Sequence, residues 1–145
     1  MRVYEVMSKD VETVSPAVQA SEAKTRMRQR KIHHLVVTRG SQLAGIVSER
    51  DLGGRKLPHS LGTWTVQDVM TTPVITVTTR TLVRRAATLM KGRSVGSLVV
   101  TSANGKVAGI VTVSDLLTLL GRRFDRDSIK KRRRTNDDGD GRWAR

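Results

Sequence analysis

The sequence has no cysteine, few aromatic residues and no apolar run long enough to cross a membrane. The lack of cysteine excludes disulfides and thiolate metal sites, and it fits a reducing compartment, so we expect a cytoplasmic protein without membrane association. Aromatic residues make up 3% of the chain, which argues against a stacking platform for single-stranded nucleic acid. The opening residues, MRVYEVMSKD, lack the apolar core of a secretory signal.

Positive charge is the main excess in the composition. The 145 residues carry a formal net charge of +14, and this excess favours an anionic partner. Lysine and arginine outnumber the acidic residues both before and after Leu120. The part of the chain that is expected to fold is therefore basic in its own right.

An internal repeat organises the chain up to Leu120. Four groups of residues recur at an offset of 63: Val6-Met7 as Val69-Met70, Thr13-Val14 as Thr76-Val77, the positions of Ala20, Ala23 and Met27 as those of Val83, Ala86 and Met90, and Leu35-Val36-Val37 as Leu98-Val99-Val100. One extra residue near Ala103-Asn104 then moves the offset to 64, at which Ala44 to Ser48 matches Ala108 to Thr112 and Asp51-Leu52 matches Asp115-Leu116. Agreement of this kind in order and spacing does not arise by chance.

Each copy predicts a βαββα unit of mixed α/β (α+β) class. β-Branched residues favour a short strand near 11–14 and 74–77, and apolar residues three and four apart favour a helix after it. Two strands follow, over 35–38 and 43–47 and over 98–101 and 107–111, and a second helix begins near Ser48 and Ser114. We expect Ser15, with Pro16 after it, and Thr78 to be the N-caps of the first helices.

The repeat also predicts the domain organisation. Residues 1–57 form the first repeat, 58–65 a linker, 66–121 the second repeat, and 122–145 a basic tail that is expected to be disordered. One unit alone buries too little surface to be stable, so the two copies are expected to pack sheet to sheet around a shared core.

The segments from Gly45 to Asp51 and from Gly109 to Asp115 are the strongest candidates for chemistry. Each leaves a strand and opens a helix, where free backbone N–H groups and the helix dipole favour an anion. A hydroxyl on Ser48 or Thr112 can bind phosphate, and a carboxylate one turn later can accept hydrogen bonds from a ribose diol. The same spacing is also that of a capping box, which satisfies the backbone and binds nothing; on spacing alone it is the commoner outcome.

The chain resembles a tandem CBS-domain protein, or Bateman module. The resemblance covers residues 3 to 120 and rests on Glu5-Val6-Met7 with Gln67-Asp68-Val69-Met70, on Ile32 to Val37, and on the two Gly-to-Asp segments. It implies two sheets that face each other with pseudo-two-fold symmetry, two clefts between them, and a homodimer. It also implies a regulatory ligand that contains adenosine, such as AMP, ADP or ATP, and no required cofactor.

Site residues follow from the resemblance position by position. It places Ser48 and Thr112 near phosphate and Asp51 and Asp115 on ribose. The ligand-binding positions of lower weight are His33, His34, Arg50, Thr13 and Thr76. His33-His34 is replaced by Gly96-Ser97 in the second copy, so the resemblance implies two unequal clefts; alternatively, one imidazole points to solvent and the other packs.

Other functions find less support in the sequence. Two adjacent histidines point in different directions and the third, His59, lies in the linker, so we expect no metal site. No P-loop, dinucleotide signature or nucleophile with a partnered base is present, which argues against an enzyme. The run Lys130 to Arg134 leaves one alternative, an interaction or nucleic-acid-binding protein that uses the repeats as a dimeric scaffold and the tail as its contact.

Overall fold

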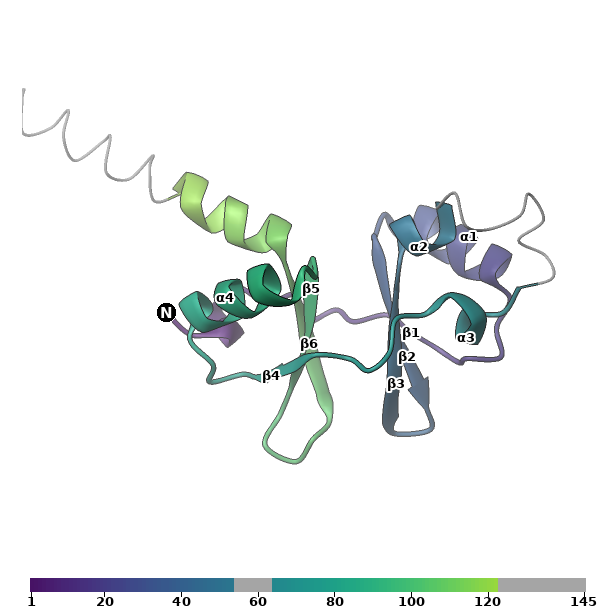
Figure 1. Cartoon of the computed structure of the whole chain (residues 1–145), viewed down its shortest axis with the longest axis horizontal. Coiled ribbons are helices and arrows are strands. Elements are labelled where there is room, and N and C mark those ends of the chain that lie inside the picture. Colours follow the sequence, from purple (N-terminus) through teal and green to yellow (C-terminus); the bar gives the residue numbers. More distant parts are fainter. Residues whose placement is uncertain (54–63, 123–145) are drawn as a thin grey trace, which may run out of the picture.

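The computed structural model describes residues 1–53 and 64–122, and it consists of two three-stranded sheets with flanking helices. Figure 1 shows the two sheets facing each other across the middle of the molecule, with the helices on the outer sides. This arrangement confirms the predicted mixed α and β fold of two packed repeats. Most of the predicted linker, with His59, and the predicted tail from residue 123 onward lie outside the described residues. Within the described residues, no helix has the length and apolar character needed to span a membrane.

The first sheet holds the strands of the first copy, in the order β1-β2-β3. β1 pairs in parallel with β2, and β2 pairs in antiparallel with β3. The elements of this copy are β1 (Thr13–Val14), α1 (Ala20–Arg30), β2 (His34–Arg39), β3 (Gln42–Ser48) and α2 (Glu49–Gly53). The predicted strands and helices are therefore all present, with ends that differ by one or a few residues.

The second sheet repeats this pattern in the order β4-β5-β6. Its elements are β4 (Thr76–Thr78), α4 (Val83–Arg93), β5 (Ser97–Thr101) and β6 (Val107–Thr112), and residues 113–122 are helical. The hairpin turns use Gly40 at φ 60° and Gly105 at φ 79°. These positive φ angles favour glycine because a Cβ atom makes them strained.

Two short helices precede the repeats and pack on the opposite copy. η1 (Val3–Glu5) places Val3 in the apolar cluster of the second copy, and α3 (Val66–Val69) places Val66 in that of the first. In Figure 1 the N-terminus accordingly lies beside α4, and α3 lies beside α1. Each sheet is thus completed by the leading segment of the other copy, so the two copies hold each other by backbone as well as by side chains.

Gly45 and Gly109, the glycines of the repeated motif, are required at this crossing. A Cβ on Gly109 would lie 2.6 Å from the carbonyl oxygen of Ser8 and 2.8 Å from the sulfur of Met7. A Cβ on Gly45 would lie 2.6 Å from the sulfur of Met70. Each methionine of the repeated Val-Met pair therefore packs over the repeated glycine of the other copy, and this close contact leaves no room for a side chain at that glycine.

The predicted N-caps of the first helices are wrong. α1 begins at Ala20 and α4 at Val83, so Gln19 and Leu82 occupy the cap positions, and neither makes a side-chain cap hydrogen bond. Ser15 and Pro16 instead lie in a turn in which Ser15 Oγ accepts from the N–H of Ala17 at 3.3 Å.

The segments that lead into each copy and pack on the other one supply hydrogen-bond acceptors for the first amides of α1 and α4. The N–H of Ala20 donates to the carbonyl of Trp64 at 2.8 Å, and that of Val83 donates to the carbonyl of Met1 at 3.0 Å. Orphan amides at a helix start need such acceptors. Both helices begin four residues later than predicted because backbone from the other copy takes the place of a local side chain.

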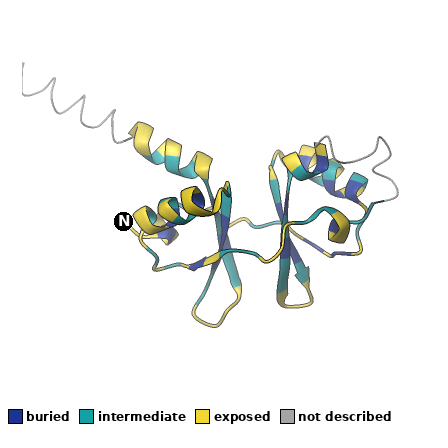
Figure 2. Cartoon of the chain, viewed as in Figure 1, coloured by how far each residue is buried: buried dark blue, intermediate teal, exposed yellow. Residues whose placement is uncertain are grey.

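Each half has its own apolar core, between its sheet and its helices. Leu35, Val37 and Val47 belong to one cluster, whereas Leu98 and Val100 belong to the other. Figure 2 shows buried positions along both sheets and on the inward sides of the helices. The expected single shared core is therefore replaced by two cores, because the inner helix faces already cover one face of each sheet.

The opposite faces of the two central strands meet between the copies. Alternation along β2 and β5 turns Val36 and Val99 away from their own cores, yet they are only 1% and 0% exposed. The facing sheets (Figure 1) therefore bury these two equivalent residues between the copies.

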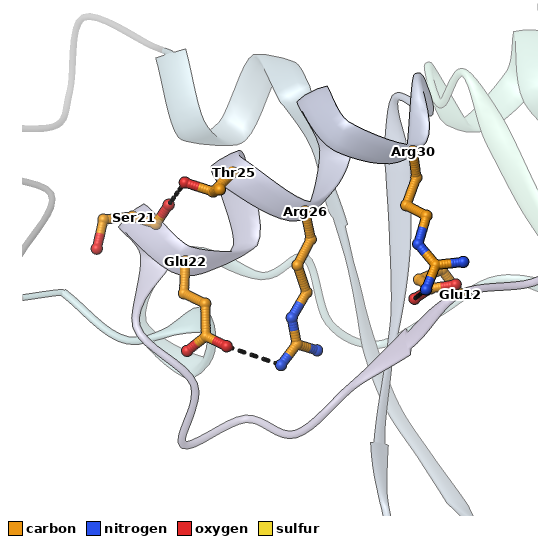
Figure 3. Close-up of polar contacts among 6 residues, drawn as sticks. All are labelled: Glu12, Ser21, Glu22, Thr25, Arg26 and Arg30. Atoms are coloured by element: carbon orange, nitrogen blue, oxygen red, sulfur yellow. Dashed lines mark hydrogen bonds and ion pairs between the residues drawn. The ribbon is translucent and has the colours of Figure 1, made fainter.

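Polar contacts cover the solvent side of α1, as Figure 3 shows. Arg26 pairs with Glu22 at 2.8 Å, one turn apart on the helix. Arg30 reaches Glu12, just before β1, at 3.6 Å. These exposed pairs contribute little to stability, but the second one places a cation beside Glu12.

Candidate functional site

Two clefts open between the copies, and each takes its walls from both. The Asp51 cleft, of about 540 Å³, is lined by Ser48, Arg50 and Asp51 of the first copy and by Val74 and Ile75 of the second. The Asp115 cleft, of about 370 Å³, is lined by Thr112 and Asp115 of the second copy and by Val11 and Glu12 of the first. The repeated motif of one copy thus faces the segment that precedes the first strand of the other.

The capping boxes that the spacing allowed are both formed. The backbone N–H of Ser48 donates to Asp51 Oδ2 at 2.8 Å, and the N–H of Asp51 donates to Ser48 Oγ at 3.2 Å. In the second copy the N–H of Thr112 donates to Asp115 Oδ2 at 2.8 Å, and the N–H of Asp115 donates to Thr112 Oγ1 at 3.3 Å. All four side chains are half-buried and have a structural role.

Capping leaves part of each carboxylate available. The cap uses Oδ2 of Asp51 and of Asp115, and within the described ranges no hydrogen bond uses either Oδ1. An ionised carboxylate accepts about four hydrogen bonds. Each cleft therefore presents a fixed carboxylate that can still accept hydrogen bonds from a ligand hydroxyl.

His33 and His34 lie at the border of both clefts. His33 is exposed, and its Nδ1 lies 2.6 Å from Glu49 Oε2. His34 is half-buried, and this burial lowers its pKa, with a smaller lowering from His33. The carboxylates of Asp51 and Asp115 act in the opposite direction.

Thr13 and Thr76 do not line either cleft, and both are exposed. The strand-leading residues Val11 and Val74 line the clefts instead, each two positions earlier. The sequence reasoning also missed Lys31, which lines the Asp115 cleft and caps the end of α1 at φ 53°. The repeat could have indicated this residue, because it aligns Lys31 with Ser94, which lines the Asp51 cleft in the equivalent position.

The remaining walls are mainly apolar. Ile46, Val74, Ile75 and Val95 line the Asp51 cleft, and Val11, Ile32, Ile110 and Val113 line the Asp115 cleft. Such walls suit a flat, weakly polar ring, with polar groups at the rim to orient it. Over residues 1–53 and 64–122 there is no cluster of three or more histidine, aspartate or glutamate side chains that could hold a metal ion.

Comparisons with known proteins agree with this geometry. The family model of the CBS domain matches residues 3–52 and 66–122, that is, both repeats. The chain is 36% identical over 118 residues to an uncharacterised protein of Methanopyrus kandleri, covering 79% of this chain and 60% of that protein. It is 34% identical over 115 residues to inosine-5'-monophosphate dehydrogenase of Korarchaeum cryptofilum, covering 79% of this chain but only 23% of the enzyme.

Solved structures show the same fold. The CBS domain pair of protein MJ0100, in complex with 5'-methylthioadenosine and S-adenosyl-L-methionine, matches with a TM-score of 0.75 and 25% identity over 85% of this chain and 98% of that one. A hexameric CBS-CP12 protein from bloom-forming cyanobacteria matches with a TM-score of 0.74 and 25% identity over 81% of this chain and 66% of that one.

Proposed function

The chain belongs to the CBS-domain family, and from this premise we propose that it is a regulatory module that senses an adenine nucleotide or another adenosyl compound in the clefts between its repeats. AMP, ADP and ATP are the proposed nucleotides. The observation that carries the proposal is the pair of clefts, each with a capped Ser/Thr–Asp motif opposite the segment that leads into the first strand of the other copy. The proposal assigns no reaction to the module and a cytoplasmic location to the protein.

The shape and chemistry of the clefts support an adenosine ligand. The apolar walls accommodate a base, and the free oxygen of Asp51 or Asp115 can accept hydrogen bonds from a ribose diol. The related MJ0100 pair is in complex with two adenosine derivatives. Cationic side chains favour phosphate groups: Arg50 lines one cleft and Lys31 the other.

A calorimetric and thermal-shift panel with AMP, ADP, ATP, 5'-methylthioadenosine and S-adenosylmethionine tests the proposal. A ligand at a hundred times its dissociation constant raises the free energy of unfolding by about 2.7 kcal/mol. We expect at least one of these compounds to bind. If none of them changes the melting temperature or gives heat on titration, the proposed function is wrong.

Substitutions of the two aspartates separate binding from capping. Asp51→Asn and Asp115→Asn each keep an oxygen that can accept the capping N–H, but they remove the negative charge and one acceptor. We expect each variant to fold and to lose binding in its own cleft. Matched Asp→Ala variants lose the cap as well, so they are expected to be less stable by about 1 kcal/mol. Unchanged affinity in both Asn variants would leave the motif with a capping role alone.

We also propose that the protein is a homodimer, formed through the outer surface of the second copy. Val113, Leu117 and Leu120 are 43%, 61% and 49% exposed, and they line a groove beside α4 together with Ala87 and Met90. The positions of Ala87, Val113 and Leu117 are taken in the first copy by Lys24, Glu49 and Gly53, whereas Met90 corresponds to another methionine, Met27. An apolar surface on one copy only is typical of a contact with a partner.

Light scattering coupled to gel filtration tests this assembly. Leu117→Glu places a charge in the apolar groove and is expected to shift the protein toward monomer. Leu82→Glu is the matched control, because Leu82 is 38% exposed but does not line the groove. A wild-type protein that is monomeric at all concentrations tested would exclude the dimer.

A second function rests on the sequence of the tail. Five successive basic residues, Lys130 to Arg134, can neutralise nucleic-acid phosphates without sequence specificity, so binding would weaken steeply with salt. Gel-shift titration of the full chain and of a chain that ends at Arg122 distinguishes this role. Equal binding by both chains would exclude the tail as the nucleic-acid contact.

A further inference from the structure

Two imidazoles, those of His33 and His34, lie where the two clefts meet, and that of His34 is the half-buried one. His34 lines both clefts, although the strand that carries it, β2, belongs to the first copy. It pairs with Ser48 across the hairpin, which places it beside the motif of the Asp51 cleft. The equivalent position of the second copy is Ser97, which does not titrate. The two clefts therefore share the imidazoles of His33 and His34 on their common border, and of these the imidazole of His34 is half-buried, whereas that of His33 is exposed and pairs with Glu49.

Charged groups of both copies surround this imidazole. His33 precedes it just before β2 begins, Asp51 acts on it from α2, and Asp115 acts on it from the helix of residues 113–122. The other charged side chains on the walls of the two clefts are Glu49 and Arg50 on one side and Asp10, Glu12 and Lys31 on the other. Glu49 is paired with His33 and Glu12 with Arg30, and the carboxylates that act on His34 are those of Asp51 and Asp115.

We propose that His34 takes up one proton when an anionic ligand enters either cleft, and that this single proton couples the two clefts. The inference rests on the proposed function and specifies its regulation. A phosphate beside the imidazole favours the imidazolium form, which donates two hydrogen bonds and carries a positive charge. Because His34 borders both clefts, binding of the first ligand protonates this imidazole, and the second ligand meets it already protonated.

The direction of the pH dependence follows from the environment of His34. In the ligand-free protein, burial lowers the pKa of His34, so the neutral form predominates near pH 7. An anion raises that pKa, so binding is accompanied by proton uptake between the free and bound values. Affinity for an anionic ligand is therefore greatest at low pH. It decreases as pH rises toward the pKa of the bound state, by up to about tenfold for each pH unit that separates the free and bound pKa values.

Isothermal titration calorimetry of the full chain with ADP, in buffers of different ionisation enthalpy at pH 7, measures this uptake directly. We expect a net uptake that approaches one proton during the first binding event and none during the second. Adenosine, which has no phosphate, is expected to bind without uptake. His34→Asn is expected to abolish the uptake with ADP and to flatten the pH dependence of affinity relative to the wild type; because ADP also titrates, the comparison between the two proteins carries the result.

His33→Asn is the matched control, because that imidazole is exposed and paired with Glu49; it is expected to retain proton uptake. Binding of ADP without uptake, or uptake that persists in His34→Asn, would overturn the inference while leaving the proposed function intact. Uptake of a second proton in the second event would show that each cleft has its own titrating group, which also overturns it. Absence of binding by every nucleotide would instead remove the proposed function, and this inference with it.

Discussion

The crossing of the two leading segments gives a sharp prediction for Gly109→Ala. The new Cβ would lie 2.6 Å from the carbonyl oxygen of Ser8, a backbone atom that cannot rotate away. That carbonyl accepts from the N–H of Ile110 at 3.0 Å, and the N–H of Ser8 donates back at 2.9 Å. Relief of the clash requires the two backbones to separate, so it weakens both hydrogen bonds.

The expected cost follows from these two bonds and from overpacking. Each hydrogen bond contributes about 0.5–1.5 kcal/mol, and overpacking of a filled site costs about 1–3 kcal/mol. We therefore expect Gly109→Ala to lower the free energy of unfolding by about 2–3 kcal/mol, or the melting temperature by roughly 8–12 °C for a domain of this size. Gly45→Ala is expected to cost less, because its closest contact is the flexible sulfur of Met70.

Urea denaturation followed by circular dichroism measures both effects. Gly92→Ala is the matched control: it lies within α4 with nothing within 4 Å of a new Cβ, so it should stabilise the protein by about 0.5–1 kcal/mol. Met70→Ala should reduce the loss of stability that Gly45→Ala causes. Met7→Ala should not reduce the loss that Gly109→Ala causes, because the carbonyl oxygen of Ser8 remains. Equal stability of Gly109→Ala and Gly92→Ala would contradict the packing of each leading segment on the opposite copy. A loss from Gly45→Ala that is reduced by Met7→Ala and not by Met70→Ala would also contradict it.

Three further outcomes are expected. Thr112→Ala removes a capping oxygen and should cost about 1 kcal/mol in urea denaturation, whereas Thr118→Ala, on the same helix but not in the cap, should not destabilise the protein. Glu22→Ala breaks the exposed pair with Arg26 and should change stability by less than about 0.5 kcal/mol; a larger loss would mean that the pair is part of a stronger network. Because the pKa of His34 is lowered in the folded state, the unfolded chain binds more protons just below its ordinary pKa. Stability should therefore fall as pH decreases below about 6.5, and His34→Asn should reduce this fall when denaturation is compared across pH.

The sequence predicts the elements of each copy because their signals are local. The continuous apolar run Leu35 to Val37 indicates a strand whose two faces are both buried, and Gly105 at φ 79° closes a hairpin in the place that Asn104-Gly105 indicates. The helix face formed by Ala20, Ala23 and Met27 is buried as its spacing predicts. Each of these features depends on residues within one copy.

The features that the sequence does not predict depend on contacts between the copies. The leading Val-Met pairs are alike, so their local sequence does not say which sheet each one completes. The helices start later than the local sequence predicts because the acceptors of the Ala20 and Val83 amides, Trp64 and Met1, come from the crossing segments. The repeated glycines, Gly45 and Gly109, are the sequence feature that indicates where another segment packs closely, since a glycine in a strand often marks a close backbone approach.

The same reasoning changes how the Ser/Thr–Asp motif is understood. Capping and ligand binding are alternatives when only the spacing is known, but the structure shows that the cap occupies one carboxylate oxygen of each aspartate. The cap holds that carboxylate in one orientation before a ligand arrives, which reduces the ordering cost of binding by about 0.5–1.5 kcal/mol for each side chain held. Ser48→Ala leaves Asp51 in place but removes one half of its capping box. It should therefore weaken ligand binding in the Asp51 cleft more than in the Asp115 cleft, in which the second capping box is unchanged.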